Sequence, residues 1–118
     1  MRTDARAAIL KVLQRHAGGE PIQTLGQGRP NWIVGLDRDN VWVETERSRR
    51  KATGPQPVPL IWLIDACDVL FAKGLITRQD LTPQSSKRSA FIYSVLSCLP
   101  DVDWQDRPIE LRVRRNPG

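Results

Sequence analysis

Glycine and proline divide this chain into short segments, each with room for one helix or one strand. Among its 118 residues are eight Gly and nine Pro. The breaks fall at residues 18–19, 30, 54–59, 74, 83, 100 and 108. Gly favours helix ends and turns, and Pro cannot continue a helix interior. Because 40% of the residues are hydrophobic, the segments can share a core, and we expect a single domain over residues 1–118.

Three segments place apolar residues at helical spacing, which predicts three main helices. The first runs from a cap at Thr3 or Asp4 to about Ala17, the second from Pro59 to about Lys73, and the third from a cap at Ser85 or Ser86 to about Leu99. In the third, Ala90 and Phe91 are expected to begin the buried face. One short turn is expected at Thr77-Arg78-Gln79-Asp80, ahead of Pro83.

Alternating apolar residues predict a β-hairpin. Its strands are Asn31–Leu36 and Val41–Thr45, joined by a turn at Asp37–Asn40. A last strand, Pro108–Val113, is expected at a sheet edge, joining the hairpin or forming a wing. Residues 20–30 read as a loop, and residues 46–59 as a charged connector stiffened by proline. The fold class is therefore a small α+β domain with three main helices, a hairpin and a C-terminal strand.

The chain has 18 basic and 13 acidic residues, which gives a net charge of +5, and most of the basic residues are Arg. An excess of Arg favours a polyanionic partner, because neutralising phosphates releases condensed counterions. No apolar run has the length of about 20 residues that a membrane span needs. The N-terminal residues lack the apolar block of a signal peptide, so a cytoplasmic location without membrane contact is expected.

The basic residues gather in three places. They are Arg47, Arg49, Arg50 and Lys51 after the hairpin, Lys87 and Arg88 at the start of the third helix, and Arg112, Arg114 and Arg115 at the tail. Ser48, Ser86 and Ser89 add hydroxyls that commonly contact phosphate, and Arg78 and Gln79 are placed to reach a groove. A helix N-terminus beside cations forms an anion site, although solvated side chains at a helix start would give the same pattern.

Two tryptophans are candidates for stacking on an extruded or modified base. Trp32 and Trp42 belong to the hairpin, and Trp42 shares the outer face of its strand with Glu44. Cover by a neighbouring loop explains an outward Trp equally well.

Catalytic patterns are weak, and we predict no catalytic residue, no metal and no cofactor. His16 is the only histidine, and it lies near the end of the first helix, with no evident access to a cleft. Cys67 and Cys98 fall inside apolar helical patterns, typical of core thiols. The only dense acidic set, Asp37, Asp39, Glu44 and Glu46, lacks the lysine expected beside a nuclease metal site, and solvated turn and strand charges explain it.

The segment Leu70–Leu81 resembles the helix–Gly–x-Ile-Thr-x-x-Asp-Leu passage of winged-helix and helix-turn-helix domains. The resemblance spans about residues 59–113 and implies that the helix over 88–99 is a recognition helix and 109–113 a wing or sheet strand. The hairpin before it departs from that pattern. The sequence around Asn31-Trp32-Ile33 and Val43–Ser48 is also similar to DNA-reading domains attached to bacterial restriction enzymes.

Together these features predict a non-catalytic module that binds double-stranded DNA, with specific or modified DNA as its target, beside a nuclease or other effector domain. The alternative is a protein–protein adaptor that docks an acidic surface through the same Arg-rich cluster. The DNA-binding hypothesis requires residues 47–51 and 86–89, far apart in sequence, to share one electropositive surface.

Overall fold

The computed structural model describes residues 4–105 and 108–114. Within them, four α-helices and seven strands form an α+β domain with two antiparallel sheets. The helices are α1 (Ala5–His16), α2 (Glu46–Lys51), α3 (Leu60–Lys73) and α4 (Ser89–Ser97), with 3₁₀ turns η1 (Arg78–Asp80) and η2 (Ser85–Arg88). The three main helices that the sequence predicts are thus present as α1, α3 and α4.

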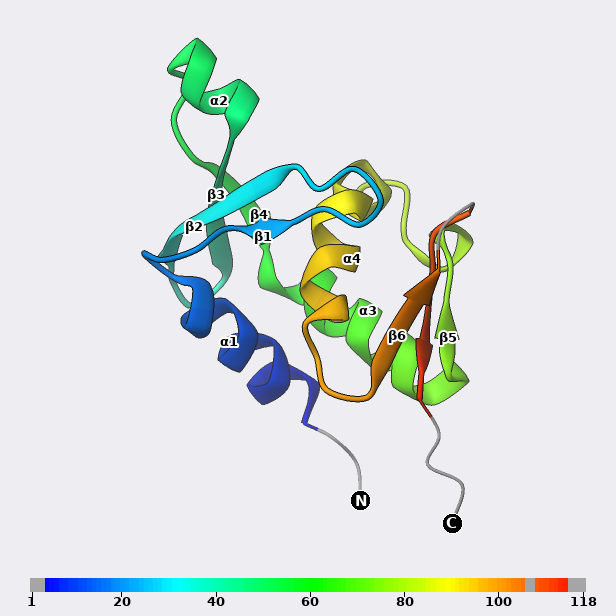
Figure 1. The fold of residues 1–118 in the computed structure, drawn as a ribbon. Helices are drawn as coiled ribbons and strands as arrows, with labels where there is room; N and C mark the ends of the chain where they lie inside the picture. Colours follow the sequence, from blue (N-terminus) through cyan, green and yellow to red (C-terminus); the bar gives the residue numbers. More distant parts are fainter. Residues whose placement is uncertain (1–3, 106–107, 115–118) are drawn as a thin grey trace.

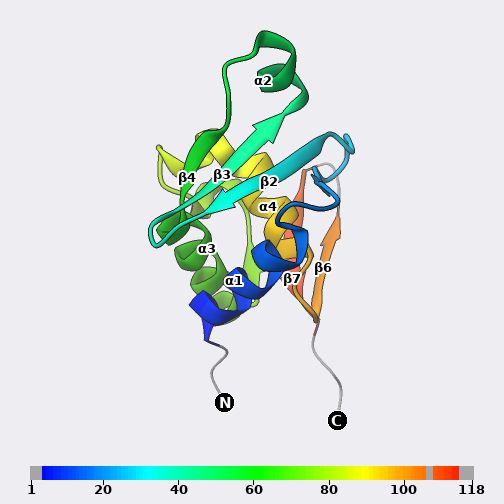
Figure 2. The same cartoon turned by 90° about the vertical axis from the view of Figure 1, so that its left-hand side faces the viewer.

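The first sheet has the strand order β1-β2-β3-β4, and the second has the order β5-β7-β6. The strands are β1 (Ile22–Gln23), β2 (Pro30–Leu36), β3 (Asn40–Thr45), β4 (Gln56–Pro59), β5 (Leu75–Ile76), β6 (Val102–Gln105) and β7 (Glu110–Val113). The predicted hairpin is confirmed as β2–β3. In Figures 1 and 2, α3 and α4 lie between the sheets, α1 packs on them beside the first sheet, and α2 projects beyond the end of β3.

Caps in the sequence fix the start of α1 and the end of α3. The Asp4 carboxylate accepts a hydrogen bond from the backbone N–H of Ala7 at 3.2 Å, which caps the start of α1. Gly74 ends α3 with φ 79°, and its N–H donates to the Leu70 carbonyl at 2.7 Å. Thr77 and Asp80 close the predicted short turn, η1, by a reciprocal capping box.

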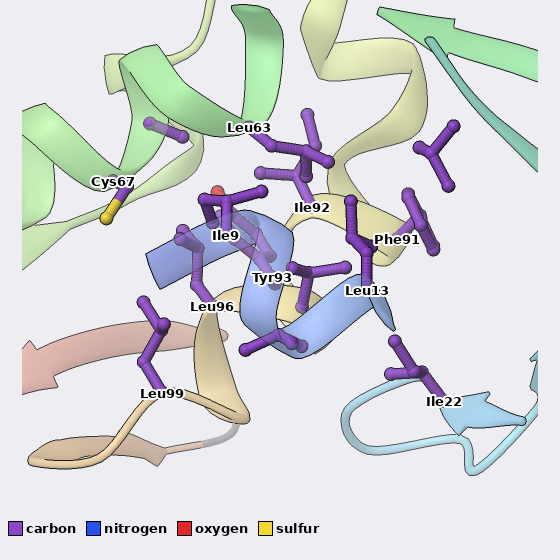
Figure 3. Close-up of a cluster of buried hydrophobic side chains, with 14 of the residues drawn as sticks. Ile9, Leu13, Ile22, Leu63, Cys67, Phe91, Ile92, Tyr93, Leu96 and Leu99 are labelled. Carbon is purple, nitrogen blue, oxygen red and sulfur yellow. The ribbon is translucent and has the colours of Figure 1, made fainter. Parts of the chain in front are cut away.

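One apolar core joins α1, α3 and α4. Ile9, Leu13, Leu63 and Ile92 are fully buried and come from all three helices, as Figure 3 shows. Six consecutive residues of α4, from Phe91 to Leu96, are buried, so this helix has neighbours on all sides. The core therefore surrounds most of α4, and Ala90 in its first turn is the exposed residue of this helix.

Several strand predictions are wrong. The last strand begins at Glu110, and it is the central strand of the second sheet, because β6, which the sequence did not predict, supplies the edge beside it. It does not join the hairpin. Residues 20–30 are not all loop, since Ile22 pairs with Asn31, and the proline-rich residues 56–59 form β4 beside β3. Both additions extend the hairpin into four strands.

Two helix predictions are corrected as well. Residues 46–51 are helical, because Thr45 and Ser48 form a capping box that starts α2 directly at the end of β3. The third helix becomes α-helical only at Ser89. The residues before it form the 3₁₀ turn η2, and the Thr82 hydroxyl accepts a hydrogen bond from the Ser85 N–H at the start of that turn. Ala90, expected to face inward, is exposed.

The left-handed end of α3 gives a stability prediction. Gly74→Ala is expected to lower the free energy of unfolding by about 1 kcal/mol, because a Cβ is disfavoured at positive φ. Urea unfolding followed by circular dichroism measures it. Gly19→Ala is the matched control, since Gly19 lacks a positive φ and its added Cβ would lie 3.9 Å from the nearest atom. Equal losses in both variants would contradict the explanation.

Candidate nucleic-acid interface

A groove of about 950 Å³ lies where three segments distant in sequence meet. One wall is the turn between β1 and β2, another is the end of β3 with α2, and the third is the junction of η2 and α4. The lining residues are Thr24, Leu25, Gly26, Gln27, Arg29, Pro30, Asn31, Thr45, Glu46, Arg47, Arg50, Lys87, Arg88, Ala90, Phe91 and Ile109. The post-hairpin cluster and the start of the last helix therefore line one groove.

The charge of this groove is strongly positive. Five of its lining residues are cationic, namely Arg29, Arg47, Arg50, Lys87 and Arg88, whereas Glu46 is its one acidic lining residue among those described. Like charges that converge on a concave surface raise the local positive potential, and this concentrates anions there. The expectation that folding gathers these side chains is met for Arg47, Arg50, Lys87 and Arg88.

Helix α2 holds two of the arginines on one side. Arg47 and Arg50 are three residues apart, so they lie on neighbouring turns of the same helical face. The capping box fixes the start of α2, with the Ser48 N–H donating to Thr45 Oγ1 at 3.1 Å and the Thr45 N–H donating to Ser48 Oγ at 2.8 Å. Ser48 is buried and its hydroxyl is occupied by these bonds, so it positions α2 rather than facing a ligand.

The turn between β1 and β2 places Arg29 at the groove. Thr24 closes this turn: its backbone N–H donates to the Arg29 carbonyl at 2.9 Å, and its hydroxyl accepts from the Arg29 N–H at 3.0 Å. Gly26 and Gly28 adopt φ values of 82° and 65°, which a tight turn of this kind requires. The Gly26-Gln27-Gly28 sequence thus allows the chain to turn back from β1 into β2.

The start of α4 presents two cations beside a helix N-terminus, where the Ser89 N–H already donates to the Ser86 carbonyl. Lys87 and Arg88 belong to η2, and no side chain caps the first turn of α4. The N–H groups of such a turn carry the positive end of the helix dipole. Ser86 donates its hydroxyl to the Pro83 carbonyl at 2.9 Å, and neither Ser86 nor Ser89 is among the groove-lining residues.

Arg49 points to a different environment from its neighbours. Its guanidinium lies 3.6 Å from the ring centroid of Trp32 and 3.5 Å from a Glu44 carboxylate oxygen. A stacked, paired guanidinium of this kind stabilises the hairpin face. Arg49 covers one face of Trp32, so that face is not open to a nucleotide base.

Trp42 is likewise engaged within the hairpin. Its Nε1–H donates to Asp37 Oδ2 at 2.8 Å, and its ring packs on Gly35, where an added Cβ would lie 3.4 Å from the ring. This bond, with the N–H groups of Asp39 and Asn40, lowers the pKa of Asp37. Trp42 thus anchors the turn, and the geometry gives the base-stacking prediction no support.

The remaining predicted polar and cationic residues lie outside the groove lining. Lys51 is exposed at the end of α2, and Arg78 and Gln79 are exposed on η1. In the tail, Arg112 pairs with Glu110 at 2.9 Å and Arg114 with Asp103 at 2.6 Å. Arg115 lies outside the described residues.

Metal-ligand clusters and reactive thiols are the two kinds of chemical group that the described part of the chain lets us assess. Among residues 4–105 and 108–114, no three His, Cys, Asp or Glu side chains gather to hold a metal ion. Burial raises the pKa of the Cys67 thiol to about 11 and also raises that of Cys98, which keeps both thiols protonated near neutral pH. No helix in that part of the chain is long and apolar enough to cross a membrane.

Twelve of the sixteen groove-lining residues are not among those predicted from the sequence, and they include Leu25, Arg29, Asn31, Phe91 and Ile109. A two-glycine turn between Ile22 and Ile33 is a signal for the β1–β2 hairpin, and it would have placed Arg29 beside the Asn31 strand. The apolar residues gave no such signal, since Phe91 and Ile109 look like ordinary core positions.

Searches among protein-family models, curated proteins and solved structures give no match for this chain. The class defined by the fold and the groove is a small α+β domain with two antiparallel sheets and a cationic surface groove.

Proposed function

We propose that this domain binds double-stranded DNA through the cationic groove and carries out no chemistry of its own. The observation that supports this most strongly is the convergence of Arg29, Arg47, Arg50, Lys87 and Arg88 on one groove from three chain segments. Phosphates are the polyanions that such a set neutralises, and Arg contacts them with two parallel hydrogen bonds. As a module without catalytic groups, it acts in the cytoplasm beside a nuclease or other effector domain.

The shape of the molecule favours a partner of extended form. Helix α2 projects beyond β3 (Figure 1), carrying Arg47 and Arg50 away from the core. Lys87 and Arg88 line the same groove from the junction of η2 and α4. A duplex presents two rows of phosphates, so it can occupy both walls at once, which a single small anion cannot do.

The winged-helix resemblance fits part of this arrangement. The second sheet combines β5 with the β6–β7 hairpin that follows α4, as a wing would. The full length of α4 is unsuited to lie in a DNA groove, because Phe91 to Leu96 are buried. We therefore propose that only η2 and the first turn of α4 contact DNA.

A pair of neighbouring arginines provides the test. Arg50→Ala is expected to weaken binding to a fluorescent duplex about threefold to tenfold at about 50 mM salt, because it removes one phosphate contact. Arg49→Ala removes the same charge from the same helix but from outside the groove lining, so we expect a change of less than about twofold. Anisotropy titrations measure both.

The wild-type titration separates the two candidate classes. Binding that falls steeply between about 50 and 200 mM salt supports the DNA proposal. If the wild-type protein binds no duplex at the lower salt concentration, the proposal is overturned and the adaptor alternative is favoured. Equal losses in Arg49→Ala and Arg50→Ala would show that the groove is not the contact surface.

A further inference from the structure

Five residues of the groove lining are apolar, here called the floor of the groove, and contacts to phosphates would leave their surface unused. Leu25, Pro30 and Ile109 are half-buried and line the groove together with Ala90 and the nearly buried Phe91. Phe91 belongs to the same core as Leu13 and Ile22, so this floor rests on rigid packing (Figure 3). A lining that combines five cations with five apolar residues suits a ligand that is anionic at one end and apolar at the other.

A buried polar side chain is also present in the lining. Asn31 is 6% exposed, and its Nδ2 donates to the carbonyls of Ile22 and Arg29, both at 3.4 Å. Because carbonyl oxygens only accept, these contacts fix which end of the amide carries nitrogen. The Oδ1 atom has no hydrogen-bond partner among the described residues, so it remains available to accept from an N–H group of a ligand.

We infer that the groove takes up one unpaired nucleotide extruded from the DNA, an inference that rests on the proposed DNA binding. The base lies on the floor formed by Leu25, Phe91 and Ile109, and Oδ1 of the Asn31 side chain accepts a hydrogen bond from a base N–H. The flanking phosphates meet Arg47, Arg50 and the cations of η2. A nucleotide combines a flat, weakly polar ring with a charged backbone, which matches this distribution of surface.

A groove of about 950 Å³ is large enough for this occupant. Pockets for small molecules span roughly 300–1,000 Å³, so a base with its sugar fits, whereas a duplex can only lie across the rim. Extruding a base has an energetic cost, which is least where the base is already unpaired. DNA with an unpaired base is therefore the preferred form.

Two otherwise identical duplexes test this inference. One carries a single bulged thymidine, and the other carries an abasic residue at the same position, so that both have a flexible backbone and only one has a base. We expect the wild-type protein to bind the thymidine bulge about tenfold more tightly than the abasic one in anisotropy titrations, as expected for one base held against side chains.

Substitutions in the floor test whether the preference for the thymidine bulge arises in the groove. Ala90→Leu narrows the groove without changing charge and is expected to reduce the tenfold preference to less than about threefold. Ala72→Leu is the matched control, because Ala72 is also an exposed helical alanine but does not line the groove. Leu25→Ala, which removes part of the floor, is a second variant with the same expected loss. Circular dichroism verifies folding.

The possible outcomes separate the inference about an extruded base from the proposal that the groove binds DNA. A preference that is lost in Ala90→Leu and Leu25→Ala but kept in Ala72→Leu supports the inference. Equal, salt-dependent binding of both bulged duplexes overturns it while leaving duplex binding intact. A preference unchanged in both floor variants also overturns it, because the base would then lie elsewhere. Failure to bind either DNA at low salt overturns the proposed function itself.

Discussion

Replacing Arg47, Arg50, Lys87 and Arg88 together by alanine is expected to weaken duplex binding about a hundredfold at about 50 mM salt. Each of these side chains lines the groove, and each phosphate contact adds about 0.9 to the slope of log affinity against log salt. The slope should therefore fall by about 3.6 in the quadruple variant. Anisotropy titrations at several salt concentrations give both quantities.

A second quadruple variant provides the control for net charge. Arg6, Lys11, Arg15 and Arg38 are exposed residues that do not line the groove, and replacing them by alanine removes the same number of charges. We expect only a small, less than threefold, loss of affinity from the weaker long-range attraction. If both quadruple variants lose affinity equally, binding follows total charge and the groove has no special role.

The largest stability effect is expected at the junction of the three main helices. Leu63→Ala should lower the free energy of unfolding by about 3 kcal/mol, because Leu63 is fully buried in the core and its truncation leaves a cavity. Ile61→Ala is the matched control on the same helix, since Ile61 is 54% exposed, and it should change stability by less than about 0.5 kcal/mol.

The same experiment tests whether the two sheets depend on one core. If they do, Leu63→Ala shifts far-ultraviolet circular dichroism and tryptophan fluorescence to the same lower urea midpoint. Of the four tryptophans, Trp32 and Trp42 report on the first sheet, Trp62 on α3 and Trp104 on the second sheet. Transitions that separate by probe would contradict a shared core.

The helices could be predicted because their signals are local. Asp4 caps α1 and Gly74 ends α3 where the sequence indicates, since a cap depends on a few neighbouring residues. The β2–β3 hairpin was predictable for a similar reason, because Asp37 closes its turn through the N–H groups of Asp39 and Asn40.

The short strands could not be predicted because their pairing is not local. Ile22 and Gln23 become a strand only because β2 is beside them, and two residues show no period of alternation. The last strand looked like an edge because β6 has only Val102 buried, leaving no alternating pattern to reveal it. The last strand, β7, is central because it also pairs with β5, a strand that precedes α4 in the sequence.

The site was predicted only in part, because local sequence shows which cations are neighbours but not where their side chains point. Clustering in sequence identified Arg47, Arg50, Lys87 and Arg88, and the fold joins them in one groove. Clustering could not separate Arg49 from Arg50, because only the direction of each side chain on α2 distinguishes stacking on Trp32 from lining the groove. Arg29 has no basic neighbour in sequence, so only β1–β2 pairing reveals it.

The most direct test of DNA binding at the groove is an amide chemical-shift map of the ¹⁵N-labelled protein with and without duplex DNA. We predict that the largest shifts fall in residues 24–31, 46–50 and 87–91, which form the three walls of the groove. Shifts concentrated instead on α1 or on β6, or no shifts at low salt, would contradict the central claim.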